Sequence, residues 1–91
     1  MIINTKNVNI LKKEEGAVKI YIGDDMVKNK LKEIRMREYI MDPKEFSELI
    51  NVKLKRYYEY EKGDSYPTLR KALEISIKLN KNVNDIWYLE L

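Results

Sequence analysis

After residue 25, apolar residues recur at helical spacing in short segments that Asp, Pro, Asn and Gly separate. Val27, Leu31 and Ile34 lie at positions i, i+4 and i+7, which places them on one stripe of a first helix from Met26 through Tyr39. Such a helix buries only one face, so it needs neighbouring helices to pack against. With 91 residues, the chain has room for one compact domain. The spacing predicts a small all-α domain.

The start of the second helix is the clearest local signal. Asp42 provides an N-cap oxygen, Pro43 fits a first helical turn because its missing N–H costs nothing there, and Glu45 completes a capping box. This helix is expected over residues 43–50. Asn51 follows, and asparagine tolerates the left-handed conformation of a tight turn. The chain should change direction directly after the second helix.

A third and a fourth helix are expected beyond that turn. The third covers residues 54–61 and is stopped by Gly63. The fourth starts at Pro67 and ends near Asn80. Its inward face is expected to hold Leu69, Leu73 (or Ala72), Ile75, Ser76 and Leu79.

The C-terminal segment predicts a short fifth helix. Asn84 is its cap, and Ile86 and Trp87 are its apolar residues. Two interpretations stay open for residues 87–91: they close the core, or they form half of a dimer interface, since exposed apolar clusters mark interfaces.

Residues 1–24 have a different pattern from the rest. Residues 8–10 and 17–22 alternate and are rich in β-branched side chains, with a polar turn at residues 12–16 between them. The pattern predicts a β-hairpin arm over residues 1–24, followed by a helical domain over residues 25–91. An isolated hairpin is marginal in water, so this arm must pack on the helices or on a second chain.

Composition excludes several classes of function. The chain has no Cys and no His, which removes disulfides, Cys/His zinc sites and imidazole chemistry. With 3 Gly, no Gly-rich phosphate loop can form. No apolar run approaches the roughly 20 residues of a membrane span, and the N-terminus turns polar by Asn4. We expect a cytoplasmic protein that is not an enzyme and has no metal or cofactor.

Positive charge is weak overall and concentrated locally. The net charge of +3 comes from 18 basic and 15 acidic residues, which make a mixed surface. Lys53, Lys55 and Arg56, however, are three cations without an acid between them. They lie at the start of the third helix, where attraction to phosphate would be strongest.

The order and spacing of the helical segments resemble a known family. LKEIR begins at Leu31, KEFSELINV ends at Val52, and LRKALEISIKLNKNVNDIW ends at Trp87. Between the last two stretches, aromatic, acidic, glycine and proline positions follow the same pattern: Tyr57, Tyr60, Glu61, Gly63 and Pro67. This arrangement resembles the phage-repressor/Cro-type helix-turn-helix proteins of the XRE family. The resemblance implies a five-helix repressor-like domain.

Three departures from that family's pattern stand out. Between Arg35 and Phe46 the chain is one residue longer than usual. Pro43 occupies a position where the family often has a phosphate-contacting Gln, and Lys53 replaces a usual Ser or Thr cap.

The resemblance implies that the third helix reads DNA in the major groove. Tyr57 and Tyr60 then face the core. The outward residues, which are candidates for base contacts, are Leu54, Lys55, Tyr58 and Glu59. Lysine donates to guanine, glutamate accepts from cytosine N4, and Leu or Tyr touches a thymine methyl group. For Tyr58, base contact and simple exposure to solvent stay open.

Phosphate contacts and one structural pair are implied as well. The phosphate candidates are Lys53, Arg56, Lys62, Ser65 and Tyr66. Arg35 and Glu61 resemble the buried ion pair that ties the first helix to the third in this family.

The sequence therefore predicts a transcriptional regulator, most simply a repressor, that binds double-stranded operator DNA. A two-fold operator calls for a homodimer, formed through the N-terminal hairpin or through residues 87–91. The alternative hypothesis is a protein-binding module, such as the antitoxin of a toxin–antitoxin pair, that recruits its partner by strand addition.

Overall fold

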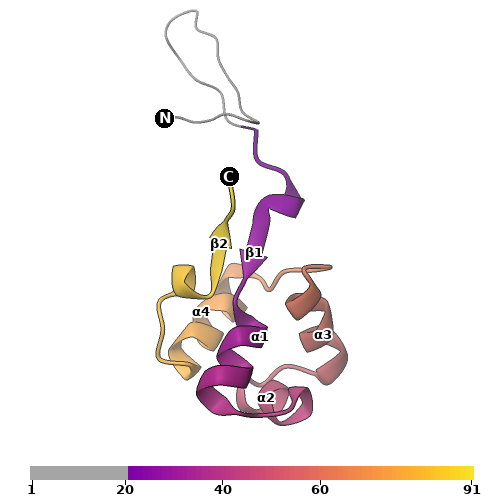
Figure 1. Ribbon diagram of the computed structural model, residues 1–91, viewed down its shortest axis with the longest axis vertical. Coiled ribbons are helices and arrows are strands. Elements are labelled where there is room, and N and C mark those ends of the chain that lie inside the picture. Colours follow the sequence, from indigo (N-terminus) through magenta and orange to yellow (C-terminus); the bar gives the residue numbers. More distant parts are fainter. Residues whose placement is uncertain (1–20) are drawn as a thin grey trace, which may run out of the picture.

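The computed structural model describes residues 21–91, which form a helical body with a two-stranded sheet rising from one end (Figure 1). The helical elements are α1 (Leu31–Glu33), continued by the π-helix η2 (Ile34–Tyr39), α2 (Pro43–Leu49), α3 (Leu54–Lys62) and α4 (Leu69–Lys78). The sheet pairs β1 (Val27–Asn29) with β2 (Trp87–Leu89), and the 3₁₀ turns η1 (Asp24–Met26) and η3 (Val83–Asp85) precede the strands.

The hairpin predicted over residues 8–22 lies outside the described residues, apart from Tyr21 and Ile22, which belong to no strand. The boundary between an arm over residues 1–24 and a domain over residues 25–91 therefore stays a prediction.

Local sequence signals set the start of α2 and the end of α3 as predicted, whereas α4 starts two residues later than the expected Pro67. At the start of α2, the Glu45 N–H donates to Asp42 Oδ1 over 2.8 Å, and the Asp42 N–H donates to Glu45 Oε1 over 3.2 Å. Thr68 caps α4 by accepting from the Lys71 N–H over 3.1 Å. Gly63 ends α3 with φ of 83°, in the left-handed region where a side chain would add strain.

The predicted first helix begins too early in the sequence. Val27–Asn29 is strand β1, and the helix starts only at Leu31, whose N–H donates to Asn29 Oδ1 over 3.0 Å. β1 pairs antiparallel with β2 from the far end of the chain. A partner so distant in sequence leaves no local signal, and Val27 fits a helical stripe as well as a strand.

The predicted fifth helix is also wrong: residues 21–91 hold four α-helices. Asn82, rather than Asn84, opens the 3₁₀ turn η3, and after Ile86 the chain extends into β2. The strand register pairs Val27 with Leu89, Lys28 with Tyr88 and Asn29 with Trp87. Aromatic residues favour strands, and pairing with β1 satisfies backbone groups that one more short helical turn would leave open.

The π-helix η2 lies in the segment between Arg35 and Phe46 where the sequence predicts one residue more than the family pattern. There the Ile40 N–H donates to the carbonyl of Arg35, five residues earlier, and the Met41 N–H donates to the same oxygen over 3.2 Å. A π-turn holds one more residue than an α-turn. Ile40 then leaves the helix in the left-handed region with φ of 52°.

The inward face of α4 agrees with the expected one except at Leu69. Ala72, Ile75 and Leu79 are buried, together with Ser76. Leu69 is exposed, contrary to the prediction, and Leu73 is also exposed, so Ala72, the alternative to Leu73, takes the inward position. The inward stripe of α4 is therefore built from smaller side chains than the sequence offered.

The core lies where the helices meet. Its buried members are Leu31, Ile34, Phe46, Ile50, Tyr57, Tyr60, Ile75, Leu79 and Ile86. Phe46 packs edge-on against Tyr39 and Tyr57, with ring centroids 5.6 Å apart in both pairs. Within residues 21–91, every helix is too short or too polar to cross a membrane.

Candidate nucleic-acid interface

The α2–turn–α3 unit is the first structural requirement for reading a DNA groove. Ile50 ends α2, Asn51 turns the chain with φ of 59°, and the Val52 N–H donates to the carbonyl of Ser47 over 2.8 Å. Val52 packs against the core between the two helices. Lys71 of α4 donates to the Asn51 carbonyl over 2.9 Å. Hydrogen bonds from Val52 and from Lys71 thus hold the turn, and the turn sets the angle between α2 and α3.

α3 separates an inward aromatic face from an outward polar face. Tyr57 is fully buried and Tyr60 is 7% exposed, as expected for the inward face. The outward face has four exposed side chains, which are Lys53, Lys55, Arg56 and Tyr58. Leu54 and Glu59, beside them, are half-buried. The structure therefore brings the proposed base-contacting residues onto one side of one helix.

The cations along α3 differ in how they are paired. Arg56 lies 3.5 Å from Glu59, and Lys62 lies 3.4 Å from Asp64. Lys53 and Lys55, in contrast, form no ion pair within residues 21–91. These two ammonium groups, at the first turn of α3, are consequently the least compensated positive charges on this face.

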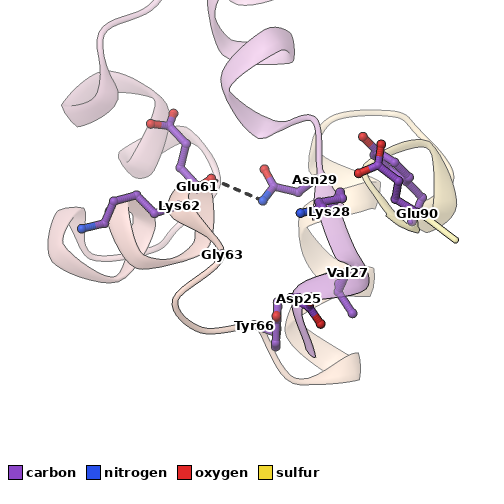
Figure 2. Close-up of a pocket in the computed structure, with 10 residues that line it drawn as sticks. Asp25, Val27, Lys28, Asn29, Glu61, Lys62, Gly63, Tyr66 and Glu90 are labelled. Carbon is purple, nitrogen blue, oxygen red and sulfur yellow. Dashed lines mark hydrogen bonds between the residues drawn. The ribbon is translucent and has the colours of Figure 1, made fainter. Parts of the chain in front are cut away.

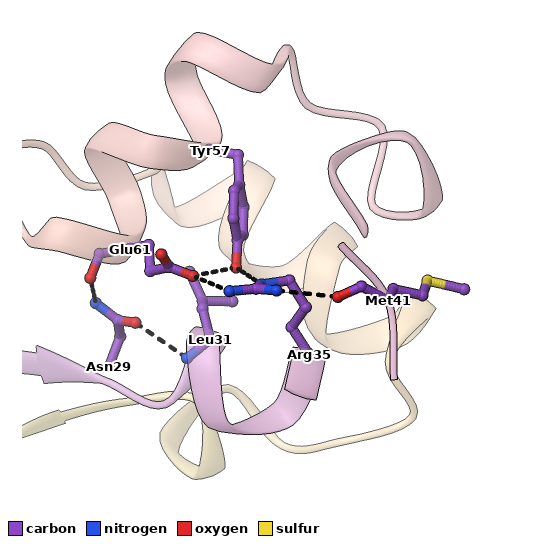
Figure 3. Close-up of polar contacts among 6 residues, drawn as sticks. All are labelled: Asn29, Leu31, Arg35, Met41, Tyr57 and Glu61. Atoms are coloured by element: carbon purple, nitrogen blue, oxygen red, sulfur yellow. Dashed lines mark hydrogen bonds and ion pairs between the residues drawn. The ribbon is translucent and has the colours of Figure 1, made fainter. Parts of the chain in front are cut away.

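A polar network beneath α3 ties it to the first helix (Figure 3). Arg35 donates from Nε to the Tyr57 hydroxyl over 3.1 Å, from Nη1 to the Met41 carbonyl over 2.9 Å, and lies 3.4 Å from Glu61. The Tyr57 hydroxyl donates to Glu61 Oε2 over 2.7 Å. Four polar groups that would each be costly to bury alone satisfy one another here.

The network shifts the pKa of two of its members. Burial works to lower the pKa of Arg35, but Tyr57 and Glu61 outweigh it and raise that pKa, so the guanidinium stays charged. Burial, with the hydrogen bond to Glu61, raises the pKa of the Tyr57 hydroxyl well above its usual range. Tyr57 therefore stays a neutral donor at any physiological pH.

Asn29 is a contact to α3 that sequence reasoning missed. Its Nδ2 donates to the Tyr60 carbonyl over 2.9 Å and to the Glu61 carbonyl over 3.4 Å, while its Oδ1 accepts from Leu31. It thus satisfies open carbonyls at the C-terminal end of α3 and an open N–H at the start of α1. The sequence predicts a helix at Asn29, and a helix there does not indicate this contact. A prediction of a strand before Leu31 would have indicated it.

The last residue of α3 and the loop after it contain the remaining phosphate candidates. Lys62 is exposed beside Asp64, and Tyr66 is 38% exposed. The hydroxyl of Ser65 is buried and has no hydrogen-bond partner among residues 21–91, so it does not face solvent. The exposed candidates are therefore the cation Lys62, which pairs with Asp64, and the ring of Tyr66.

A groove of about 500 Å³ lies between β1 and the C-terminal end of α3 (Figure 2). Its lining mixes charges of both signs: Asp25, Glu61 and Glu90 with Lys28 and Lys62. This mixture selects neither an anion nor a cation. Among residues 21–91, no group of three or more carboxylates is placed to hold a metal ion.

Comparison with known proteins agrees with the geometry. No curated protein matches the chain. The family model described as helix-turn-helix, however, matches residues 31–86, which run from the start of α1 to the end of η3 and include the whole α2–turn–α3 unit. The chain therefore belongs to the helix-turn-helix family, and it is a DNA-binding protein of the phage-repressor/Cro (XRE) type.

Proposed function

We propose that this DNA-binding regulator recognises a specific operator in the cytoplasm by placing the outward face of α3 in the major groove. The observation that supports this most directly is the contrast between the two faces of α3. The inward face is held by Arg35 and Asn29, while the outward face begins with the uncompensated cations Lys53 and Lys55. A helix that is fixed from behind and positive at its N-terminal turn fits the geometry of a recognition helix.

Each outward side chain has a role that its chemistry allows. Lys55 donates to guanine O6 or N7, Glu59 accepts from cytosine N4, and Leu54 or Tyr58 touches a thymine methyl group. Phosphate contacts then come from the flanking cations and from the loop after α3. Those candidates are Lys53, Arg56, Lys62 and Tyr66. Ser65, the remaining candidate, offers phosphate no free donor, because its hydroxyl is buried and its N–H donates to the Glu59 carbonyl over 3.4 Å.

The regulatory outcome we propose is repression. A protein seated on operator DNA blocks polymerase without further machinery. Two copies on a two-fold operator would place their recognition helices about 34 Å apart.

The decisive experiment measures DNA affinity against salt concentration for wild type and for the double variant Lys55→Ala/Arg56→Ala. Operators come from selection of bound genomic fragments. We expect wild-type affinity to fall steeply with salt, and the double variant to bind at least about tenfold more weakly with a shallower salt slope. The matched control, Lys32→Ala/Lys78→Ala, removes the same charge from other exposed positions and should bind nearly as wild type. Failure of the wild type to select any duplex at low salt would refute the proposal.

A protein-binding role, such as that of an antitoxin, has one observation in its favour. The two-stranded sheet of β1 and β2 has no third strand within residues 21–91, and open strand edges accept strands from partners. Binding of such a partner should be indifferent to Lys55→Ala/Arg56→Ala. The same double variant therefore separates the two functions.

A further inference from the structure

α4 has an exposed line of large apolar side chains, which we name the α4 stripe. It consists of Leu69, Leu73 and Ile77, which are 73%, 44% and 79% exposed. Their spacing of four residues places them along one face of the helix. Single exposed apolar residues are common on protein surfaces, but a continuous line is a mark of an interface.

The α4 stripe is distinct from the face that α4 uses within its own domain. Ala72, Ile75 and Leu79 already bury the inward side, and Lys71 holds the α2–α3 turn. α4 is therefore apolar over two neighbouring faces, and only one of them is covered within the described chain. A helix that needed no partner would place polar residues on the second face.

We propose that the α4 stripe is the surface through which two copies of this chain associate, with their α4 helices antiparallel across a two-fold axis at Leu73. The stripe is symmetric about that residue, with one large apolar side chain four positions to each side. In this arrangement Leu73 meets its own copy, and Leu69 of each chain meets Ile77 of the other. A two-fold interface requires such a self-complementary surface.

The charges beside the stripe obey the same symmetry. Arg70 and Glu74 lie next to it and pair within the helix over 3.2 Å, while remaining exposed. Arg70 and Glu74 lie on the same side of the stripe. A two-fold axis at Leu73 keeps that side but reverses the helix direction, so Arg70 of each copy lies near Glu74 of its partner. The surface thus complements itself in charge as well as in shape, which is why a second copy, and not an unrelated protein, is its occupant.

The interface is short, since only three apolar side chains from each copy take part. Such contacts are weak and transient alone. If the proposed function holds, two copies bound to adjacent half-sites would be held at high effective concentration, and the contact would add cooperativity on DNA. The association itself does not depend on that function.

Sedimentation of the full chain at high micromolar concentration tests the proposal. We expect wild type to dimerise, and Leu73→Glu and Ile77→Glu each to shift the chain to monomer, because each places two like charges at the axis or beside it. Ile77 is the more exposed of the two, so Ile77→Glu is expected to fold even if Leu73→Glu does not. The matched control is Ile40→Glu, an equally exposed apolar residue outside α4, which should dimerise as wild type.

A charge exchange tests the antiparallel arrangement. Arg70→Glu and Glu74→Arg should each weaken the dimer, and the double variant Arg70→Glu/Glu74→Arg should restore it. A monomeric wild type, or a dimer that survives both Leu73→Glu and Ile77→Glu, would overturn the proposal and leave residues 1–24 or 87–91 as the dimer interface. Each α4 variant should still bind a single half-site. A chain that dimerises but selects no DNA would refute the proposed function alone.

Discussion

α3 and α4 are helices of similar length in one small domain, and they differ in what they leave exposed. Both bury an apolar stripe, Tyr57 and Tyr60 in α3 and Ile75 and Leu79 in α4. The open face of α3 is polar and positive at its first turn, whereas the open face of α4 is the apolar α4 stripe. Burial of an apolar stripe therefore explains how both helices pack. The exposed faces distinguish the role proposed for α3, contact with DNA, from the one proposed for α4, contact with a second copy.

The two helices also differ in how they are held. α4 packs mainly through apolar contacts, which tolerate small shifts. α3 is fixed by directional hydrogen bonds from Arg35 and Asn29, which specify its position and its rotation. A helix that must match the edges of bases needs that second kind of support, since a misplacement of one ångström loses a hydrogen bond.

The largest expected effect comes from removing the polar support of α3. Arg35→Ala leaves Glu61 without its ionic partner in a largely buried place, and we expect the free energy of unfolding to fall by about 3–5 kcal/mol. Urea denaturation measures it. Arg37→Ala is the control, since Arg37 pairs with Glu33 in solvent and should matter by less than about 0.5 kcal/mol. Equal effects of the two changes would contradict the network's role.

How much of this design could be predicted depends on the range of the interactions. The capping box of Asp42 and Glu45 and the stop at Gly63 are local, so the sequence located α2 and the end of α3. The inward position of Tyr57 is implied by the family resemblance, and the side chain is buried as expected. β1 and β2 could not be found in this way, because each exists only through pairing with the other at the opposite end of the chain.

The candidate site shows the same division. The outward positions of Lys55 and Tyr58 on α3 are implied by the family resemblance together with helical spacing, and both side chains are exposed. The contact of Asn29 with α3 could not, because it depends on strand β1. The exposure of Leu69 could not either, because composition alone does not reveal which of two apolar faces a domain covers.

A smaller effect is expected on the open face of α3. Lys55→Ala should weaken binding to the selected operator by about 1–3 kcal/mol and relax discrimination at one base pair, without lowering stability. Fluorescence anisotropy with single-base operator variants measures both. Lys78→Ala on α4 is the matched control, and it should leave affinity and discrimination unchanged. A uniform loss across all sequences would instead make Lys55 a phosphate contact.

Asn29→Ala should have a moderate effect that links stability to recognition. It removes the donor for the carbonyls at the end of α3, so we expect a loss of about 1–2 kcal/mol in the free energy of unfolding. Operator affinity should fall while the salt slope stays unchanged, because Asn29 offers no charge to phosphate. A changed slope would mean that α3 moves far enough to lose phosphate contacts.

The smallest effect distinguishes the two faces of α3 by their tyrosines. Tyr57→Phe removes the hydrogen bonds to Arg35 and Glu61 and should cost about 1 kcal/mol, whereas Tyr58→Phe on the outward face should leave stability unchanged.

Because the pKa of Tyr57 is raised in the folded state, the fold binds its proton more tightly than the unfolded chain. That contribution is complete below about pH 10 and is lost as pH rises beyond it. Urea denaturation at about pH 8 and about pH 11 should therefore show a steeper alkaline loss of stability in wild type and in Tyr58→Phe than in Tyr57→Phe. Equal slopes in all three would mean that the proton of Tyr57 does not stabilise the support of α3.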